Sequence, residues 1–236
     1  MNHPLRIHRE GRTLLIFLCL LLFAIHVPIY LYSPHALFAV TLVLSAMLLV
    51  FVTFFFRNPE RVLDMDDPHC LIAPADGTVV VVEPVMENEY FHEERLQVSI
   101  FMSPFNVHAN WYPVDGTVIE STHQKGRHKG AWLPKSSTEN ERSLVVIRTH
   151  TSDLVAVRQV AGAMARRIVT YAKPGTEAKR NIHMGFIKFG SRVDMYLPLD
   201  TEMFVESGDI VRGNQTVIGR LNKHNRQTTD TEDEQV

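Results

Sequence analysis

Cysteine is scarce in this sequence, and neither sign of charge is in excess. The 236 residues include two cysteines, Cys19 and Cys70, which are too few for a disulfide framework or a four-cysteine zinc site. Lysine and arginine number 24 against 26 acidic residues, so the net charge of −2 gives no reason to expect a nucleic-acid partner. With 45% hydrophobic residues, the chain is too apolar to be disordered throughout.

The short motifs that bind metals and nucleotides are also missing. The sequence has no His-Glu-x-x-His, Cys-x-x-Cys or Walker loop, although it contains 12 histidines. His123 and His128 lie on a basic segment with no third ligand near them in the sequence, which favours a structural or solvated role over metal binding. We therefore expect no metal site.

Two long apolar runs near the N-terminus are the strongest pattern that is present. Residues 14–32 and 37–56 contain no Asp, Glu, Lys or Arg, and each can cross the ~30 Å hydrocarbon core of a bilayer as a helix. A cleaved signal peptide is the alternative for the first run, but no small-x-small cleavage site accompanies it and the second run follows at once. The sequence thus predicts that residues 1–56 form a membrane anchor, a two-helix transmembrane hairpin.

The basic residues around these runs predict the orientation of the hairpin. Arginines flank the runs only on their outer sides, and the connecting turn, residues 33–36, carries no Lys or Arg. The positive-inside rule then places both ends in the cytoplasm, so we expect a protein of the cell (inner) membrane whose remaining domain faces the cytoplasm. The flanking residues are Arg6, Arg9, Arg12, Arg57 and Arg61.

The sequence after the second run is typical of short β-strands separated by Gly-containing turns. One short helix is expected around Ala163–Tyr171. This pattern predicts a mainly β (α+β) fold, with an antiparallel β-sandwich or barrel-like domain over residues 57–221 and one or few short helices. Residues 222–236 are expected to form an acidic, disordered tail. The candidate strands are Thr78–Val85, Leu96–Met102, Val114–Glu120, Leu144–Arg148, Leu154–Val160, Arg192–Leu197 and Thr216–Leu221.

The pattern Pro-x-Asp-Gly-Thr-Val occurs twice, at residues 74–79 and 113–118. It indicates either an internal duplication of a strand–turn–strand unit or a chance recurrence of turn chemistry, and the sequence favours neither. Taken alone, the aspartates of the two patterns are more typical of turn formers than of catalysts. Gly190-Ser191, before another candidate strand, is by itself only a turn or a bulge.

Six short blocks occur in order along the chain, and as a set they resemble the phosphatidylserine decarboxylase family in its short bacterial and archaeal form. The resemblance extends from about Phe54 to Leu221, and the membrane hairpin agrees with a phospholipid substrate. The blocks are Arg57-Asn58-Pro59-Glu60-Arg61, Ala73-Pro74-Ala75-Asp76-Gly77, Met102-Ser103-Pro104-Phe105-Asn106-Val107-His108, Asn140-Glu141-Arg142, Gly190-Ser191-Arg192-Val193-Asp194 and Gly208-Asp209-Ile210-Val211-Arg212-Gly213.

The resemblance implies a lyase of phospholipid biosynthesis that decarboxylates phosphatidylserine to phosphatidylethanolamine. It also implies a zymogen that cuts itself between Gly190 and Ser191, giving a large chain (residues 1–190) and a small chain (residues 191–236). Ser191 then becomes a covalent pyruvoyl group, the only cofactor implied. The substrate amine forms a Schiff base with this group, which accepts the electrons left behind by CO₂. The implied partners are the substrate, membrane lipids and the two chains of one molecule, and a homodimer is compatible with the family.

By the same resemblance, Ser191, His108 and Asp76 form the catalytic set. A serine hydroxyl is a weak nucleophile until a base takes its proton, and His108 can do this near neutral pH. Asp76 would orient the imidazole, as in hydrolytic triads. His108 is also the expected proton donor during decarboxylation. Gly190 leaves room for the strained turn that self-cleavage needs.

Contacts to the lipid are predicted less directly. Longer family members carry a second histidine just before the one matched by His108, and this chain has Asn106 there, which can hydrogen-bond the head group. Lys125 and Arg127 lie on a long basic segment, residues 124–142, together with Lys129 and Lys135. These cations would attract anionic lipid at about 1 kcal/mol each near a charged surface, or the segment is simply a solvated loop. Both interpretations stay open.

The three phenylalanines that close the second run, Phe54, Phe55 and Phe56, are expected at the membrane interface beside an acyl chain.

Two alternatives to this function remain at the level of sequence. The substrate could be a related serine phospholipid such as archaetidylserine, because no residues that read the acyl chain are recognisable. In a different class, units similar to Gly208-Asp209-Ile210-Val211-Arg212-Gly213 also occur in lipoyl-like and hammerhead modules, so a non-enzymatic, membrane-anchored adaptor would share the C-terminal pattern. Such an adaptor does not account for Asp76, His108 and Gly190-Ser191 together.

Overall fold

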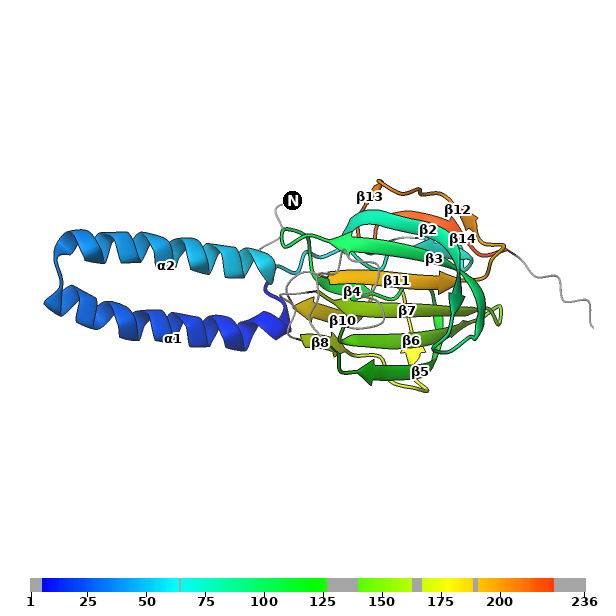
Figure 1. The fold of residues 1–236 in the computed structure, drawn as a ribbon, viewed down its shortest axis with the longest axis horizontal. Helices are drawn as coiled ribbons and strands as arrows, with labels where there is room; N and C mark the ends of the chain where they lie inside the picture. Colours follow the sequence, from blue (N-terminus) through cyan, green and yellow to red (C-terminus); the bar gives the residue numbers. More distant parts are fainter. Residues whose placement is uncertain (1–5, 64, 127–139, 163–166, 189–190, 223–236) are drawn as a thin grey trace, which may run out of the picture.

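Two long antiparallel helices project from one end of a β domain in the computed structural model (Figure 1). The helices are α1 (Arg9–Tyr32) and α2 (His35–Phe55), which contain most of the two predicted spans. A tight turn at Ser33 and Pro34 joins them at the end farthest from the domain. The structure describes residues 6–63, 65–126, 140–162, 167–188 and 191–222.

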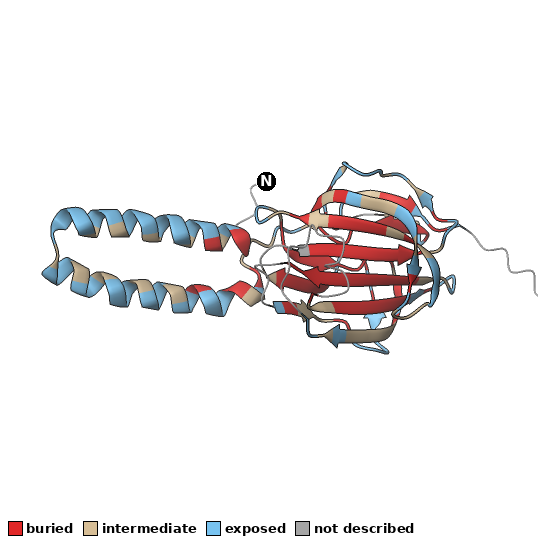
Figure 2. Ribbon diagram, viewed as in Figure 1, coloured by how far each residue is buried: buried red, intermediate tan, exposed pale blue. Residues whose placement is uncertain are grey.

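Most of the helical hairpin surface is exposed although it is strongly apolar (Figure 2). Its buried residues are Gly11 and Leu15 in α1 and Val52 and Phe55 in α2, all near the domain. At 1.5 Å per residue the helices are about 36 and about 31 Å long, and both are long and apolar enough to cross a membrane. The exposed Leu, Val and Phe side chains along the helices favour the hydrocarbon core of a membrane over water as their surroundings.

The described part of the domain contains fourteen strands, and each of the seven predicted strands overlaps one of them. Most of the strands that the sequence did not predict are only two to four residues long. The strands are β1 (Cys70–Ile72), β2 (Gly77–Glu87), β3 (Glu93–Met102), β4 (Ala109–Trp111), β5 (Gly116–Gln124), β6 (Arg142–Thr149), β7 (Leu154–Ala161), β8 (Arg167–Thr170), β9 (Glu177–Ala178), β10 (His183–Lys188), β11 (Ser191–Leu197), β12 (Glu202–Met203), β13 (Ile210–Val211) and β14 (Val217–Arg220).

These strands form three antiparallel sheets, which confirms the predicted mainly β fold. The largest is curled and has the order β13-β2-β3-β11-β7-β6-β5-β9. The other two have the orders β4-β10-β8 and β1-β14-β12. The main core is built from alternate residues of the large sheet together with buried residues of both small sheets, among them Leu71, Met184 and Ile218. Alternation along each strand thus places one face of the curled sheet in the core.

The helix predicted around Ala163–Tyr171 is wrong for Arg167–Thr170, which forms strand β8. Residues 163–166 lie outside the described residues. β8 pairs with β10 over four residues, and Ile168 is buried while its neighbour Arg167 is exposed. The alanine- and arginine-rich sequence favours a helix locally, but strand pairing and the burial of Ile168 in the core override that preference.

The two Asp-Gly turns occupy matching places near opposite edges of the large sheet. Gly77 begins β2 and Gly116 begins β5, and a register shift follows two residues later in each strand. A Cβ atom on Gly77 would lie 2.1 Å from the backbone oxygen of Phe101, and one on Gly116 would lie 2.2 Å from that of Arg148. Each strand also pairs with a two-residue edge strand, β13 or β9. This correspondence supports the internal duplication over chance recurrence.

Candidate active site

His108 immediately precedes β4 and is fully buried. Its Nδ1 lies 2.9 Å from the backbone oxygen of Asn106. Because a carbonyl oxygen can only accept, Nδ1 donates its hydrogen there, and the neutral ring carries its lone pair on Nε2. Nε2 is buried and has no hydrogen-bond partner among the described residues. The ring therefore presents a basic nitrogen that lacks a donor.

Burial lowers the pKa of His108 to about 4. The carbonyl oxygen of Asn106 and the carboxylate of Asp76 oppose this shift, whereas the positive charge of Arg57 adds to it. The ring of Phe55 lies 4.1 Å from the imidazole, between ring centroids, and contributes to the dry surroundings. The histidine is therefore neutral at neutral pH and able to accept a proton.

The backbone of His108 lies beside the strand that leads to the predicted cleavage site. Its oxygen accepts a hydrogen bond of 3.2 Å from the backbone nitrogen of Ile187 in β10. Gly190 follows three residues later and lies outside the described residues. The backbone of Ser191 begins β11, which pairs with β3 on one side and β7 on the other. The predicted cleavage site thus lies where the chain passes from a small sheet to the centre of the large one.

A network of buried polar side chains lies beside the start of β11. Met102 of β3 pairs with the first residue of β11, and Asn110 donates from Nδ2 to its sulfur at 3.8 Å. Gln159 donates to the Asn110 oxygen at 2.7 Å and accepts from the hydroxyls of Ser143 and Thr170 at 2.7 and 2.8 Å. Such satisfied buried networks fix the positions of neighbouring strands. Sequence reasoning missed these residues because isolated polar residues within strands carry no motif.

Asp76 lies in the turn before β2, and its carboxylate holds three segments together. The guanidinium of Arg61 binds both carboxylate oxygens, with Nη2 2.9 Å from Oδ2 and Nη1 close to Oδ1. The backbone nitrogens of Gly213 and Val107 donate to the same carboxylate at 2.8 and 3.4 Å. Both members of the ion pair are about nine-tenths buried, with side-chain exposures of 9% for Asp76 and 10% for Arg61.

This arrangement differs from the direct contact between Asp76 and His108 that the triad pattern predicts. Among the described residues no hydrogen bond joins the two side chains, and the carbonyl of Asn106 orients the imidazole instead. In the part of the chain that the structure describes, the hydrogen bond that links Asp76 to this segment comes from the backbone nitrogen of Val107, the residue before the histidine. Arg61 lies in one of the six sequence blocks, but nothing in the block indicates that it pairs with Asp76.

The predicted lipid-binding residues lie in different places. Oδ1 of Asn106 accepts from the backbone nitrogen and the hydroxyl of Ser103, both at 2.8 Å, so its side chain closes a turn beside His108. Lys125 is exposed and lines a separate hollow of about 740 Å³ together with Arg167. Arg127, like Lys129, Lys135 and the rest of residues 127–139, lies outside the described residues.

The Nε2 of His123 lies 3.2 Å from a carboxylate oxygen of Glu141, and the histidine side chain is 42% exposed. His128 falls in the part of the chain that the structure does not describe. Within the described ranges, no group of three His, Cys, Asp or Glu side chains is placed to hold a metal ion.

The phenylalanines at the end of α2 separate into two kinds. Phe54 is 42% exposed, as expected for a residue at the membrane interface. The same expectation is wrong for Phe55 and Phe56, which are fully buried because the last turn of α2 docks on the domain. Their rings lie 6.4 and 5.5 Å from the ring of Phe186 in β10, between centroids. The expected domain boundary after residue 56 therefore passes through a packed cluster.

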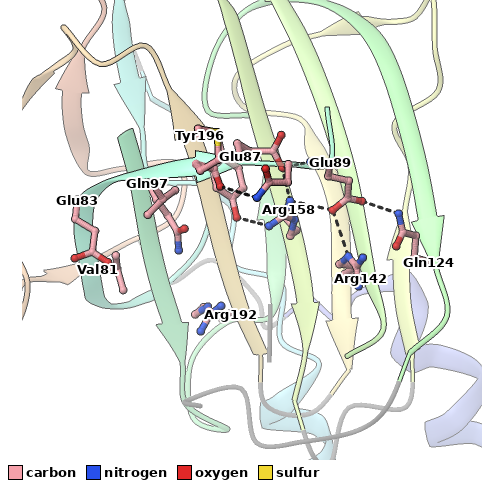
Figure 3. A pocket seen from close by; sticks show the side chains of 13 residues that line it. Val81, Glu83, Glu87, Glu89, Gln97, Gln124, Arg142, Arg158, Arg192 and Tyr196 are labelled. Atoms are coloured by element: carbon pink, nitrogen blue, oxygen red, sulfur yellow. Dashed lines mark hydrogen bonds and ion pairs between the residues drawn. The ribbon is translucent and has the colours of Figure 1, made fainter. Parts of the chain in front are cut away.

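A second, charged cavity of about 630 Å³ lies on the outer face of the large sheet, under the curled β2–β3 hairpin (Figure 3). Arg158 lies 2.6 Å from Glu87 and 2.9 Å from Glu89, which also contacts Arg142 at 3.3 Å. Neither His108 nor Asp76 is among the described residues that line this cavity. Its ion pairs balance in charge and hold the hairpin tip against the sheet.

Comparison with known proteins gives a consistent result. The family model for phosphatidylserine decarboxylase matches residues 48–219. A phosphatidylserine decarboxylase proenzyme of Parabacteroides distasonis is 54% identical over 220 residues, which is 93% of this chain and 100% of the relative. Proenzymes of the same name from Bacteroides fragilis and Porphyromonas gingivalis are 53% and 45% identical, each over 92% of this chain and at least 96% of the relative.

Proposed function

This chain belongs to the phosphatidylserine decarboxylase family, and we propose that it becomes active by cutting its own backbone between Gly190 and Ser191. It is a self-processing proenzyme that decarboxylates phosphatidylserine to phosphatidylethanolamine, an enzyme of phospholipid metabolism. The non-enzymatic adaptor considered from the sequence therefore does not apply.

His108 acts as the base for the first step of self-cleavage. Its Nε2 takes the proton of the Ser191 hydroxyl as the serine oxygen attacks the carbonyl carbon of Gly190. The peptide C–N bond then breaks, the proton passes from Nε2 to the departing nitrogen, and Gly190 is left as an ester on Ser191. The observation that carries this proposal is the buried Nε2 of His108, which has no hydrogen-bond partner among the described residues.

Elimination and hydrolysis complete the cut. Loss of the Cα proton of Ser191 breaks the ester C–O bond, releases Gly190 as the carboxylate end of the large chain and leaves dehydroalanine. Its imine tautomer takes up one water and loses ammonia, which leaves a pyruvoyl group. When present, this group provides a carbonyl that accepts the electrons released with CO₂. In turnover, His108 relays a proton to the decarboxylated carbon, which its neutral Nε2 first accepts.

The surroundings of β11 suit a covalent cofactor at the end of a strand. The backbone of Ser191 lies between β3 and β7 in the large sheet, and the buried network of Asn110 and Gln159 supports the neighbouring strands. After the cut, β11 keeps both neighbours, β13 pairs with β2, and β14 pairs with β1. These pairings hold the small chain on the large one and keep its new end in place.

Replacing His108 by glutamine should leave most of the chain uncut. Glutamine can keep a hydrogen bond to the Asn106 carbonyl, but it cannot take a proton from serine at neutral pH. We expect self-cleavage to fall by at least about 100-fold, the usual contribution of a positioned acid–base group. The measurement is a denaturing gel of the purified chain, on which uncut protein runs as one band.

His183→Gln is the matched control for this variant. His183 lies in the neighbouring strand β10, with its ring 5.0 Å from that of Trp111, between centroids, and it has no assigned role in the reaction. We expect this variant to cut normally. Normal cutting by His108→Gln would show that another group is the base.

The two apolar helices suggest that the protein is associated with a membrane. We propose that the β domain lies on the cytoplasmic side of that membrane. The backbone nitrogen of His8 donates to the oxygen of Phe56 at 2.8 Å, and that of Asn58 donates to the oxygen of Arg6 at 2.7 Å. Both basic ends of the hairpin therefore meet at the domain, opposite the uncharged turn. The positive-inside rule assigns that side to the cytoplasm.

A reporter fused after Val236 should therefore be active only if it works in the cytoplasm. We expect a fluorescent protein at this position to fluoresce and an alkaline phosphatase at the same position to be inactive. As a control, alkaline phosphatase fused after Ser33, in the turn between the helices, should be active. Phosphatase activity after Val236 would reverse the proposed orientation.

We assign the contacts with substrate lipid to Asn106, Lys125 and Arg127. Asn106 lies beside His108, and its Oδ1 is engaged with Ser103, so Nδ2 is the group that would donate to the head group. Lys125 is exposed beside Arg167, where it would attract an anionic lipid together with Arg127.

A further inference from the structure

We propose that the membrane hairpin is part of the active centre, because the ring of Phe55 at the end of α2 forms the wall that covers His108 and keeps water from it. Phe55 is then a positioning residue, and self-cleavage requires the hairpin to be docked on the domain. This inference rests on the proposed role of His108 as the base.

The contact between the two rings is close and completely enclosed. Their centroids are 4.1 Å apart, with the ring planes inclined by 35°. Both side chains have 0% exposure. No other described aromatic ring comes as near to His108, since that of Phe186 lies 6.5 Å away. Phe55 therefore covers a face of the imidazole that would otherwise open toward the base of the helices.

The hairpin is held in this position by contacts that do not involve His108. Phe56 packs face to face with Phe186, with centroids 5.5 Å apart and planes 9° from parallel. Gly11 of α1 lies so close to Phe56 that a Cβ on it would be 2.4 Å from the ring. The backbone oxygen of Phe56 accepts from His8 at 2.8 Å. These contacts place the last turn of α2 against the domain and so set the position of Phe55.

The groups that face His108 do not replace the cover that Phe55 provides. Arg57 disfavours the protonated ring, whereas Asp76 and the Asn106 carbonyl favour it. Burial is the largest influence and holds the pKa of the ring near 4. Removing the phenyl ring admits water, which raises the pKa toward the ordinary value of about 6.5. The variant would then lose neutral base in mildly acidic solution, whereas the wild type would not.

The experiment measures the rate of self-cleavage against pH for the full chain made by cell-free synthesis into lipid nanodiscs. The wild type should cut at nearly the same rate at pH 5.5 and pH 8. Phe55→Ala should cut at pH 5.5 at about a tenth of its own pH 8 rate, because a group with a pKa near 6.5 is about 10% neutral there. Phe55→Leu keeps most of the apolar volume and should show a smaller loss in the same direction.

Leu144→Ala is the matched control, because Leu144 is a buried apolar residue, 2% exposed, in a separate cluster that contains no residue of the helical hairpin. We expect this variant to keep the flat pH profile of the wild type. If Phe55→Ala cuts at no pH, Phe55→Leu decides between the outcomes. A flat profile for Phe55→Leu, or an equal bend for Leu144→Ala, would overturn the inference.

The same experiment separates this inference from the proposed function. A wild-type chain that is never cut would contradict self-cleavage itself. A wild-type chain that is cut normally, with Phe55 and Leu144 variants that behave alike, would contradict only the role of Phe55.

Discussion

Ser191→Ala should remain a single chain of full length under all conditions in which the wild type is cut. Alanine has no hydroxyl, so the carbonyl of Gly190 meets no nucleophile at this position, and neither the ester nor the later pyruvoyl group can form. Scaling the 26.9 kDa chain by length, the wild type should give pieces of roughly 22 and roughly 5 kDa, whereas the variant should give neither. Decarboxylation should be lost with the cut.

Ser207→Ala is the control for this substitution. Ser207 is also in the small chain, and within the described part of the chain its hydroxyl makes one long hydrogen bond, of 3.4 Å, to the backbone oxygen of Val80. This variant should be cut and active like the wild type. Cutting of Ser191→Ala at the same bond would rule out the serine mechanism.

Asp76→Asn should lose both stability and self-cleavage. The substitution removes the negative charge that faces the guanidinium of Arg61, and the side chains of this pair are only 9% and 10% exposed. An unpaired charge at such a depth costs about 3–5 kcal/mol of folding free energy. The same carboxylate accepts from the backbone nitrogen of Val107, next to His108, so the base is displaced as well. Urea unfolding in the uncut Ser191→Ala background measures the first effect, and the rate of cutting measures the second.

Asp115→Asn is a control from the other copy of the Asp-Gly turn. Asp115 pairs with Arg180 at 2.6 Å, as Asp76 pairs with Arg61, but its side chain is 26% exposed and it lies in the turn before β5. We expect a smaller loss of stability and a normal rate of cutting. Equal rates of cutting for the two variants would show that Asp76 does not act on His108.

The repeating patterns in the sequence predicted most of the fold. Two uncharged runs indicated the helices, and alternation of apolar and polar residues indicated the long strands. Alternation could not predict strand β8, because its local sequence favours a helix. Its pairing with β10, a separate segment of the chain, decides that it is a strand. The same limit applies to β4 and β10, which are recognisable as strands only in the assembled sheet.

The sequence could name the candidate site residues but not their arrangement. The family blocks pointed to Asp76 and His108, and Arg61 stood in one of the blocks without an assigned role. That the Asn106 carbonyl orients the imidazole, and that Asp76 pairs with Arg61, depends on contacts across the fold. Phe55 was assigned to the membrane interface because hydropathy does not distinguish a ring facing lipid from one facing the domain.

The most direct test of self-cleavage at Gly190-Ser191 is the intact mass of the purified wild-type protein, measured beside Ser191→Ala. The account predicts two masses for the wild type, a large chain that ends at Gly190 and a small chain that begins at residue 191. The small chain should be lighter by one ammonia than its sequence requires, because its first residue has become a pyruvoyl group. A single full-length mass for the wild type, or a small chain with an intact serine amine at its start, would contradict it.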